Sequence, residues 1–433
     1  MGYIIPVLQE KFKTSKIIAL HIEKFPRHPG VSSLCSADNI EIEKFLDEHL
    51  TDIKNIQIIE WRPSLNFYKE SYVKLLSIVV KYLKRADAAE RTTAAFGKRW
   101  VNNFFKNICN INNTVLYKES SIPVIITGSG PSLQDAVPVI KKSQDFCLII
   151  AASSSASALK HNGIKPDFII AADGGSWALR HLYRCEIVPL AVNLCAALPS
   201  QSFKLPKLII NDGSFWQSII LHELKLPSII IGQRGTVTAT AIELAIILSS
   251  GNIFLAGMDL SVNDIRTHVK PYNFDNLFIE KENRFSPLYS QAFNRSFLIR
   301  QGGSLDIYAS WFKTYLAYDK SAANQNPINQ RKIFSLKSGA DIFEDGEKLL
   351  LSNKGARKDI KSYFKTENYK NDPQVSREKV INALLNALKD KRYSDDLKRE
   401  LSLLLFPGNK NITVRELETS LKEMPRNGFK SYE

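Results

Sequence analysis

Short apolar strands alternate with helical segments through the middle of the chain, and this rhythm constrains the fold more than any other feature. Each expected strand is a continuous apolar run; between residues 121 and 320 the runs lie at Val124–Thr127, Phe146–Ala152, Phe168–Ala172, Leu190–Asn193, Lys207–Asn211, Ser228–Ile231 and Ile253–Ala256. Strands that are apolar on both faces belong to parallel sheets covered by helices on both sides. The sequence therefore predicts an α/β fold with a central Rossmann-like, mostly parallel sheet.

The first 115 residues predict a small α/β domain that ends in helices. Ile17–Ile22 and Ile53–Trp61 are apolar runs of strand length. Two helical stretches follow, at about residues 67–85 and from Ala88 to Ile108. In the second stretch large apolar side chains recur at four-residue spacing, which predicts a buried stripe along that helix.

Residues 336–433 predict a charged, helical C-terminal region. Thr413–Glu416 has the pattern of a capping box, in which a threonine and a glutamate bind each other's backbone N–H groups at a helix start. Another helix, rich in aromatic residues, is expected at Ser304–Tyr318. These patterns predict three domains, at residues 1–115, 116–335 and 336–433, with the ligand site in the central one.

Composition excludes several classes of protein. The five cysteines include no Cys-x-x-Cys pair and no histidines have metal-ligand spacing, so neither a disulfide scaffold nor a metal site is expected. The net charge of +14 is spread along the chain, whereas nucleic-acid binders concentrate it on one face, so no nucleic acid is expected as a partner. Polar residues interrupt every long apolar stretch and the N-terminus lacks a signal-peptide pattern, so we expect a cytoplasmic protein without membrane insertion.

One turn has the pattern of an anion site. The first strand of the central region runs directly into Gly128, Ser129, Gly130, Pro131, Ser132 and Leu133, and a helix follows. Glycine lets the backbone approach a ligand, proline suits the first turn of a helix, and the N–H groups at a helix start attract phosphate. The alternative is a plain tight turn, because Gly-Pro pairs commonly separate elements. The turn lacks the lysine of the P-loop and the third glycine of the dinucleotide fingerprint.

Polar residues follow other expected strands as well. Ser153, Ser154 and Ser155 follow one strand, Asp173-Gly174-Gly175 follows the next, and Asn193 ends another. Because ligands of open α/β sheets bind at the carboxyl ends of the strands, the three groups together predict one shared crevice. Each group taken alone is better explained as a turn or a helix cap.

Three further groups lie downstream. Gly235 and Thr236 lead into a helix, Gly257-Met258-Asp259 ends the next strand, and Thr267–Tyr272 lies in a long polar loop. His268 in this loop is the candidate for proton transfer, because it follows the strand-end motifs and histidine titrates near neutral pH. The alternative is an inert loop histidine.

The ordered set of motifs resembles that of motility accessory factor (Maf) proteins. The resemblance extends over about residues 10–330 and includes Phe96–Trp100 with Asn102 and Asn103. The central region also resembles bacterial CMP-sialic acid-dependent sialyltransferases. They share the Gly-x-Gly-Pro-Ser-Leu turn, a strand similar to Ile253–Asp259, and a later helix similar to Leu305–Tyr308.

This resemblance implies a glycosyltransferase that moves a nonulosonic, sialic-acid-like sugar from a CMP donor to Ser or Thr of flagellin, a step of flagellar assembly and motility, with no tightly bound cofactor. His268 would take the proton of the acceptor hydroxyl, and Asp173 would bind donor hydroxyls. The remaining donor site would comprise Gly128–Ser132, Ser153, Ser154, Asn193, Gly235, Thr236, Asp259 and Tyr272 or Tyr289. The sialyltransferases differ in carrying their histidine and tyrosines closer to the later helix, and an asparagine in place of Asp173. We expect the C-terminal region to help hold flagellin.

Two other functions fit the same sequence. Archaeal pterin diphosphokinase-like proteins resemble the central domain and would use ATP and Mg²⁺. A non-catalytic, flagellin-binding accessory protein on a degenerate transferase fold is the other alternative, although the intact Gly, Ser and Asp groups argue against decay.

Overall fold

A computed structural model describes residues 4–24, 28–50, 53, 55–183, 185, 188–232, 236–300, 309, 312, 332–337, 343–352, 359–368, 376–409 and 411–424. The chain divides into two compact units, Met1–Ala95 and Phe96–Glu433. Helix α4 (Lys69–Ile108) runs through this division. Within the described residues, no helix is both long enough and apolar enough to cross a membrane.

The first unit packs helices beside a small parallel sheet. Its elements are α1 (Ile4–Lys11), β1 (Ile18–His21), β2 (Ser32–Cys35), α2 (Asn39–His49), α3 (Arg62–Phe67) and the first part of α4. Strands β1 and β2 pair in parallel, and a core centred on Ile42, Leu46 and Ile78 joins α2 to α4. The strand expected at Ile53–Trp61 was wrong for residues 55–61, which pair with no strand and leave Ile58 and Ile59 46% and 42% exposed.

Helix α4 is a single element where the sequence analysis expected two. Its 40 residues run through Ala86–Ala88, where we had expected a break. Neither proline nor glycine occurs between Lys69 and Phe96, so nothing in the sequence interrupts the backbone hydrogen bonds of the helix. The expected stripe is buried at Phe104 and Ile108, whereas Phe96 at its start remains 39% exposed.

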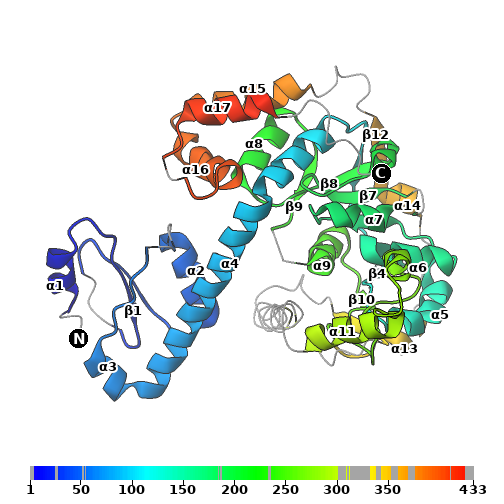
Figure 1. The fold of residues 1–433 in the computed structure, drawn as a ribbon, viewed down its shortest axis with the longest axis horizontal. Coiled ribbons are helices and arrows are strands. Elements are labelled where there is room, and N and C mark those ends of the chain that lie inside the picture. The colour runs from blue at the N-terminus through cyan, green and yellow to red at the C-terminus, as the bar shows by residue number, and fades with distance from the viewer. Residues whose placement is uncertain are drawn as a thin grey trace. The chain divides into compact units, whose positions relative to one another are not determined.

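The second unit is built on a ten-stranded sheet, and the predicted α/β fold class is confirmed (Figure 1). Its strands lie in the order β11-β10-β4-β5-β6-β7-β8-β3-β12, with β9 also paired to β8, and all pairs are parallel except β3 with β12. The strands are β3 (Asn113–Tyr117), β4 (Val124–Thr127), β5 (Leu148–Ala152), β6 (Phe168–Ala171), β7 (Leu190–Asn193), β8 (Lys207–Asn211), β9 (Ser228–Ile230), β10 (Ile253–Ala256), β11 (Ile333–Leu336) and β12 (Phe364–Asn368).

Helices cover both faces of this sheet because its strands are apolar on both faces. Ile125 and Ile149 pack in one core cluster with the end of α4 and with α5 and α8, whereas Ile126 and Ile150, one residue further along, pack in another with α9. The helices and short 3-10 turns of the central region are α5 (Leu133–Ser143), η1 (Ser153–Ser155), α6 (Ala156–His161), η2 (Ser176–Ala178), α7 (Leu179–Leu182), η3 (Ser200–Lys204), α8 (Phe215–Glu223), α9 (Val237–Leu248), α10 (Asp275–Glu280) and α11 (Leu288–Arg300).

The C-terminal part of the chain is mainly helical but also completes the sheet. It contains α13 (Glu347–Ser352), α14 (Ile360–Tyr363), α15 (Arg377–Lys389), α16 (Ser394–Leu405) and α17 (Val414–Glu423), and it contributes β12. The capping box at the start of α17 is confirmed, with Thr413 and Glu416 each bonding the other's backbone N–H. The helix expected at Ser304–Tyr318 lies outside the described residues except for Ala309 and Phe312.

The end of α4 is fastened to the sheet through a buried amide. Asn107 is fully buried, and its Nδ2 donates to the backbone oxygens of Leu194, at 2.7 Å, and Ala196, at 2.8 Å, just after β7. Buried carbonyl groups that lose a donor destabilise the folded state, because water cannot replace it. Asn107 therefore couples the helix to the carboxyl end of the sheet.

Replacing Asn107 with alanine should lower the free energy of unfolding by about 2 kcal/mol, because two buried carbonyl groups lose their donor. The matched control is Asn110→Ala, since Asn110 is exposed and its Nδ2 donates to Lys106 O at 2.7 Å. That change should alter stability by less than about 0.5 kcal/mol. Urea unfolding followed by circular dichroism measures both, and equal effects of the two substitutions would contradict the role of Asn107.

Candidate functional site

Two turns interlock at the carboxyl end of neighbouring strands. Gly128 and Gly130 follow β4, and Gly257 follows β10, which pairs with β4. Gly128 N donates to Ala256 O, and Gly130 N donates to Gly257 O, both at 2.8 Å. A Cβ atom on Gly128 would lie 2.6 Å from Gly257 O, and one on Gly257, whose φ is +67°, would lie 2.6 Å from Gly128 O. The glycines are therefore required by the contact between the two backbones.

The carboxylate of Asp259 lies at the start of α5. Its Oδ2 accepts a hydrogen bond from Ser132 N at 3.1 Å, and a Cβ atom on Gly130 would lie only 2.0 Å from it. A carboxylate is favourable there because the N-terminal end of a helix carries a partial positive charge. A phosphate bound to the same helix start would have to share it with this carboxylate.

The buried hydroxyl of Ser132 lies in the same turn. Its Oγ has no hydrogen-bond partner among the described residues, and the side chain is only 7% exposed. Buried polar atoms are normally hydrogen-bonded, so Ser132 Oγ is an atom of this turn that a ligand could satisfy.

The loop that contains His268 is attached to the same turn. Val269 N donates to Ser129 O at 2.9 Å. The ring of His268 stacks on that of Tyr272, with centroids 4.1 Å apart and planes within 9° of parallel, and its Nδ1 lies 2.9 Å from Thr267 Oγ1. The predicted candidates of the turn and of this loop thus come together in one place.

The surroundings of His268 make its imidazole a weak base. Burial is the main cause that lowers its pKa to about 4, and His181, Lys270 and Arg295 lower it further, against an opposing effect of Asp275. His268 is therefore uncharged near neutral pH. The pKa of Tyr272 is raised above its usual range by burial and by Asp275, so its phenol stays protonated and can donate a hydrogen bond.

A second histidine, which the sequence analysis missed, lies beside this pair. His181 lies on α7, and its ring centroid is 5.6 Å from that of Tyr272 and 5.0 Å from that of Phe274. The amide of Asn273 ties the loop to α7, since its Nδ2 donates to Arg180 O at 2.8 Å. His181 follows the Asp-Gly-Gly group after β6 by a few residues, and this position is the only sequence signal that points to it.

Asp173 is exposed and forms a cluster with His181, Tyr272 and His268 at the carboxyl end of the sheet. Its Oδ1 accepts a hydrogen bond from Gly175 N at 2.7 Å, which shapes the turn after β6. Its negative charge raises the pKa of His181, although the larger effect on that histidine is burial, which lowers it. The sequence-predicted residues His268, Tyr272 and Asp173 are thus joined by one further side chain, the imidazole of His181, whose pKa responds to the charge of Asp173.

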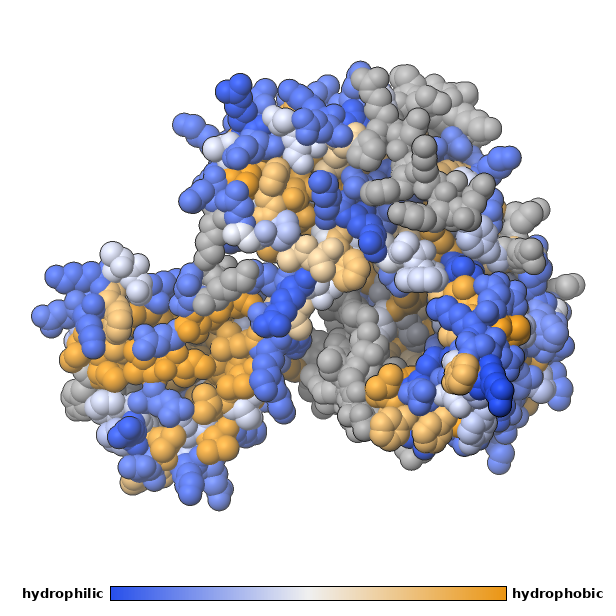
Figure 2. Space-filling model, viewed as in Figure 1, coloured by the Kyte–Doolittle hydropathy of each residue, from blue (hydrophilic) through white to orange (hydrophobic). Residues whose placement is uncertain are grey.

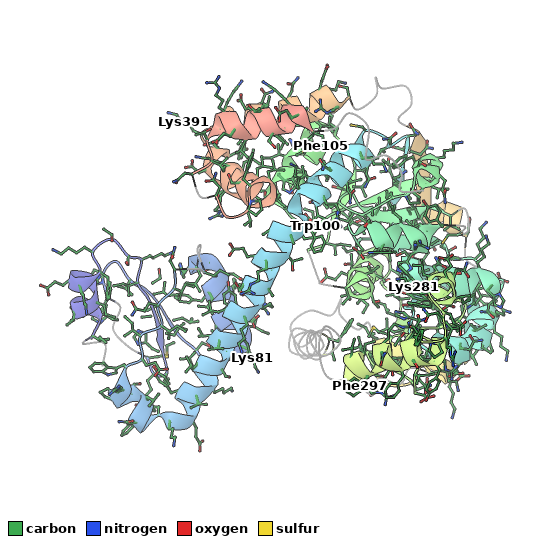
Figure 3. All side chains as sticks on the ribbon, in the orientation of Figure 1. Lys81, Trp100, Phe105, Lys281, Phe297 and Lys391 are labelled. Atoms are coloured by element: carbon green, nitrogen blue, oxygen red, sulfur yellow. The ribbon has the colours of Figure 1, made fainter. Side chains whose placement is uncertain are left out.

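The end of α4 packs against the turn that carries Asp173. A Cβ atom on Gly174 would lie 2.4 Å from Trp100 Cδ1, and Asn103 Nδ2 donates to Gly174 O at 3.1 Å and to Cys195 O at 3.0 Å. Trp100 is labelled on this part of α4 in Figure 3. On its neighbouring face, α4 meets α16, because a Cβ atom on Gly97 would lie 2.7 Å from Leu404 O. The Phe96–Trp100 motif therefore has an architectural role.

The remaining predicted residues lie at the same edge of the sheet, where β5, β7 and β9 end. Ser153 is buried and Ser154 partly buried in η1, while Ser155 pairs its hydroxyl with that of Thr127 at 2.8 Å. Asn193 Oδ1 accepts from Cys195 N at 2.8 Å, and Thr236 caps α9 by accepting from Ala239 N at 3.0 Å. Gly235 lies outside the described residues.

Helix α11 carries exposed apolar side chains next to the cluster. Tyr289, Phe293 and Phe297 are 67%, 49% and 48% exposed, and Figure 2 shows apolar groups on the surface of the second unit where Figure 1 places α11. On the same helix Arg295 stacks over Phe278, with its Cζ 3.6 Å from the ring centroid. The two tyrosines expected in the donor site therefore differ, since Tyr272 is in the cluster and Tyr289 is on the exposed surface.

The charge of Asp259 should limit the affinity of the site for phosphate. Asp259→Asn keeps an acceptor for Ser132 N and removes the charge, so we expect CMP to bind at least about tenfold more tightly, because two like charges at 4 Å repel by about 4 kcal/mol near a protein surface. The control is Asp135→Asn, an exposed acid in the first turn of the same helix. Calorimetric titration with CMP measures the affinity of both variants. Weaker binding by Asp259→Asn would show that the carboxylate contacts the ligand favourably.

Comparisons with known proteins place this geometry in context. A family model described as 6-hydroxymethylpterin diphosphokinase MptE-like matches residues 98–264. An uncharacterized protein of Treponema pallidum (strain Nichols) is 27% identical over 290 residues, which are 66% of this chain and 64% of that protein, so this chain spans less than two thirds of that relative.

A solved structure is similar over nearly the whole chain. The structure of MAf glycosyltransferase from Magnetospirillum magneticum AMB-1 matches with a TM-score of 0.50 and 14% sequence identity, covering 98% of this chain and 71% of that one. At this identity the likeness concerns the fold. The architecture that the resemblance to Maf proteins implied is therefore confirmed, and the fold of this chain is similar to that of the MAf glycosyltransferase.

Proposed function

We propose that this chain is a glycosyltransferase that transfers a nonulosonic acid from a CMP donor to serine or threonine hydroxyls of flagellin. The observation that carries the proposal is the cluster at the carboxyl end of the sheet, where the turn after β4, Asp173 and the His268–Tyr272 loop come together. The cluster lies on a fold similar to that of a MAf glycosyltransferase. A site at this edge is where open α/β sheets bind ligands.

The residues of the cluster suit departure of a nucleotide phosphate. When CMP leaves, negative charge grows on its phosphate, and protonated donors aimed at that charge stabilise the transition state. We assign this role to the phenol of Tyr272, which stays protonated, and to the hydroxyl of Ser132, which has no partner among the described residues. His268, stacked on Tyr272, holds the phenol in place. With a pKa of about 4, it would accept a proton from the incoming hydroxyl only weakly.

The surface beside the cluster suits a protein acceptor. Contiguous exposed aromatic side chains are typical of surfaces that bind other proteins. The stripe of Tyr289, Phe293 and Phe297 is such a surface, on the same helix as Arg295, which acts electrostatically on Tyr272. The basic C-terminal helices are a second surface proposed to hold flagellin.

The match to the MptE-like family model favours a second candidate, a pterin diphosphokinase. That reaction would need ATP and Mg²⁺. Among the described residues, no three His, Cys, Asp or Glu side chains gather as a metal-binding group. The model matches residues 98–264, which include the interlocked turns but not His268 or Tyr272.

The two functions are separated by incubating the purified chain with each set of substrates. We expect the intact mass of flagellin to rise by one or more nonulosonic acid residues when a CMP donor is present, with and without EDTA. ATP and a pterin alcohol should give no AMP. AMP release that requires Mg²⁺, without any mass change of flagellin, would overturn the proposal in favour of the diphosphokinase.

Tyr272 should matter far more than Tyr289. Tyr272→Phe removes the phenolic donor from the cluster and should slow transfer by about 100-fold or more, the usual effect of losing one donor to a developing oxyanion. Tyr289→Phe is the matched control, because it keeps the exposed aromatic ring of the stripe on α11 and removes only a hydroxyl outside the cluster, so its transfer rate should stay within about twofold. Initial rates of flagellin modification measure both, and equal rates would remove Tyr272 from the mechanism.

A further inference from the structure

We propose that His181 and Asp173 form the proton-accepting pair of this site, with His181 taking the proton from the acceptor hydroxyl and Asp173 stabilising the imidazolium that forms. The inference rests on the proposed glycosyl transfer and assigns its base. It replaces His268, the histidine expected from the sequence, with one that the sequence did not single out.

The first support is an unpartnered ring nitrogen. Among the described residues, His181 Nδ1 is buried and has no hydrogen-bond partner. Leaving such an atom unbonded destabilises the folded protein, so buried polar atoms of this kind commonly face a ligand or a bound water. His181 therefore has a nitrogen available to a substrate hydroxyl, whereas His268 Nδ1 already bonds to Thr267.

The second support is the charge around each histidine. Asp173 is the charged group that acts on His181, and it favours the protonated ring. His268 is surrounded by Lys270, Arg295 and His181, which disfavour protonation, and its one carboxylate neighbour, Asp275, is paired with Lys270. A base must become a cation when it takes a proton, so the carboxylate beside His181 stabilises the product of that step.

The third support is the exposed surface next to His181. Asp173 is exposed, and Trp177, on the turn between it and α7, is 60% exposed with its ring centroid 6.2 Å from that of Phe274. The surface beside His181 therefore offers an acceptor segment a carboxylate and an aromatic ring to bind. The ring of His268 is stacked on Tyr272, and the backbone of the next residue, Val269, is bonded to the turn after β4.

The proposed step balances in atoms and electrons. The acceptor oxygen forms a bond to the anomeric carbon as its O–H bond breaks, and the proton passes to His181. The bond from the anomeric carbon to the phosphate oxygen breaks, and its electron pair leaves with CMP. His181 then returns the proton to water, and no oxidant, reductant or further reactant is needed.

Burial and the groups around His181 set the expected pH dependence. The titratable and charged groups on the segments around it are Asp173 before η2, Arg180 on the same helix, Lys160 and His161 on α6, and His268 and Tyr272 in the loop. The net effect lowers the pKa of His181 below its ordinary value of 6.5, with burial as the main cause. The transfer rate should therefore fall as the pH drops through this lowered pKa, because the base becomes protonated.

The pair is tested first without turnover. Titration of the histidine Cε1–H signals by NMR, with His181 assigned through His181→Gln, should give a pKa below 6.5. Asp173→Asn should lower it further, because the carboxylate no longer favours the cation. Asp275→Asn is the control, since Asp275 raises the pKa of His268. It should move the His268 signal and leave that of His181 in place. An unchanged His181 pKa in Asp173→Asn would overturn the pair.

Transfer to flagellin then tests the role of the pair. His181→Gln should slow transfer by about 100- to 10,000-fold, the usual contribution of a general base, while CMP affinity stays within a few-fold. Asp173→Asn, an exposed substitution that should leave the fold intact, should move the acid limb of the rate profile to lower pH. A wild-type acid limb in His181→Gln, or loss of that limb only in His268→Gln, would refute the assignment. If wild-type protein transfers from no CMP donor, the proposed function fails, and the NMR titration still decides whether Asp173 and His181 interact.

Discussion

The close approach of two backbone turns, after β4 and after β10, is the constraint on which the site depends. Gly128 and Gly257 each lack the side chain that would collide with the other's carbonyl oxygen, and Asp259 then reaches the start of α5. Val269 attaches the histidine loop to the same turn. A side chain at either glycine would separate the turns, and the carboxylate and the loop would lose their positions together.

This contact changes how the glycine-rich turn is interpreted. The sequence pattern favoured a phosphate cradle, because glycine and a helix start are what such cradles use. In the structure the same glycines are required by packing, and one N–H at the helix start already binds a carboxylate. The position of the turn in the fold was therefore predictable, whereas its ligand was not. Its phosphate-binding role stays a prediction.

Continuous apolar runs allowed β4 through β8 and β10 to be predicted to within a few residues, because a strand that is buried on both faces must consist mainly of apolar residues. Strand β12 was missed because charged and polar residues interrupt it where it forms an edge. His181 was missed for a different reason. On a short helix it looks like any partly buried histidine, and its partners in the loop come from some 90 residues further along, as the bond between Asn273 and Arg180 illustrates. Local patterns contain no information about such contacts.

The order of strands in the sheet has a consequence for the synthesis of the chain. Strands β4 to β8 follow one another both in sequence and in space, so they can pair as they emerge from the ribosome. The sheet ends on one side in β11, which pairs with β10, and on the other in β12, which pairs with β3, while β9 pairs with β8. Until those late segments are made, β10 and β3 present unpaired backbone groups, the kind of edge that recruits other chains. A nascent chain that stopped before residue 333 would therefore contain most of the site and yet be prone to aggregate. Strands β11 and β12 thus protect the sheet from aggregation while the chain is being synthesised.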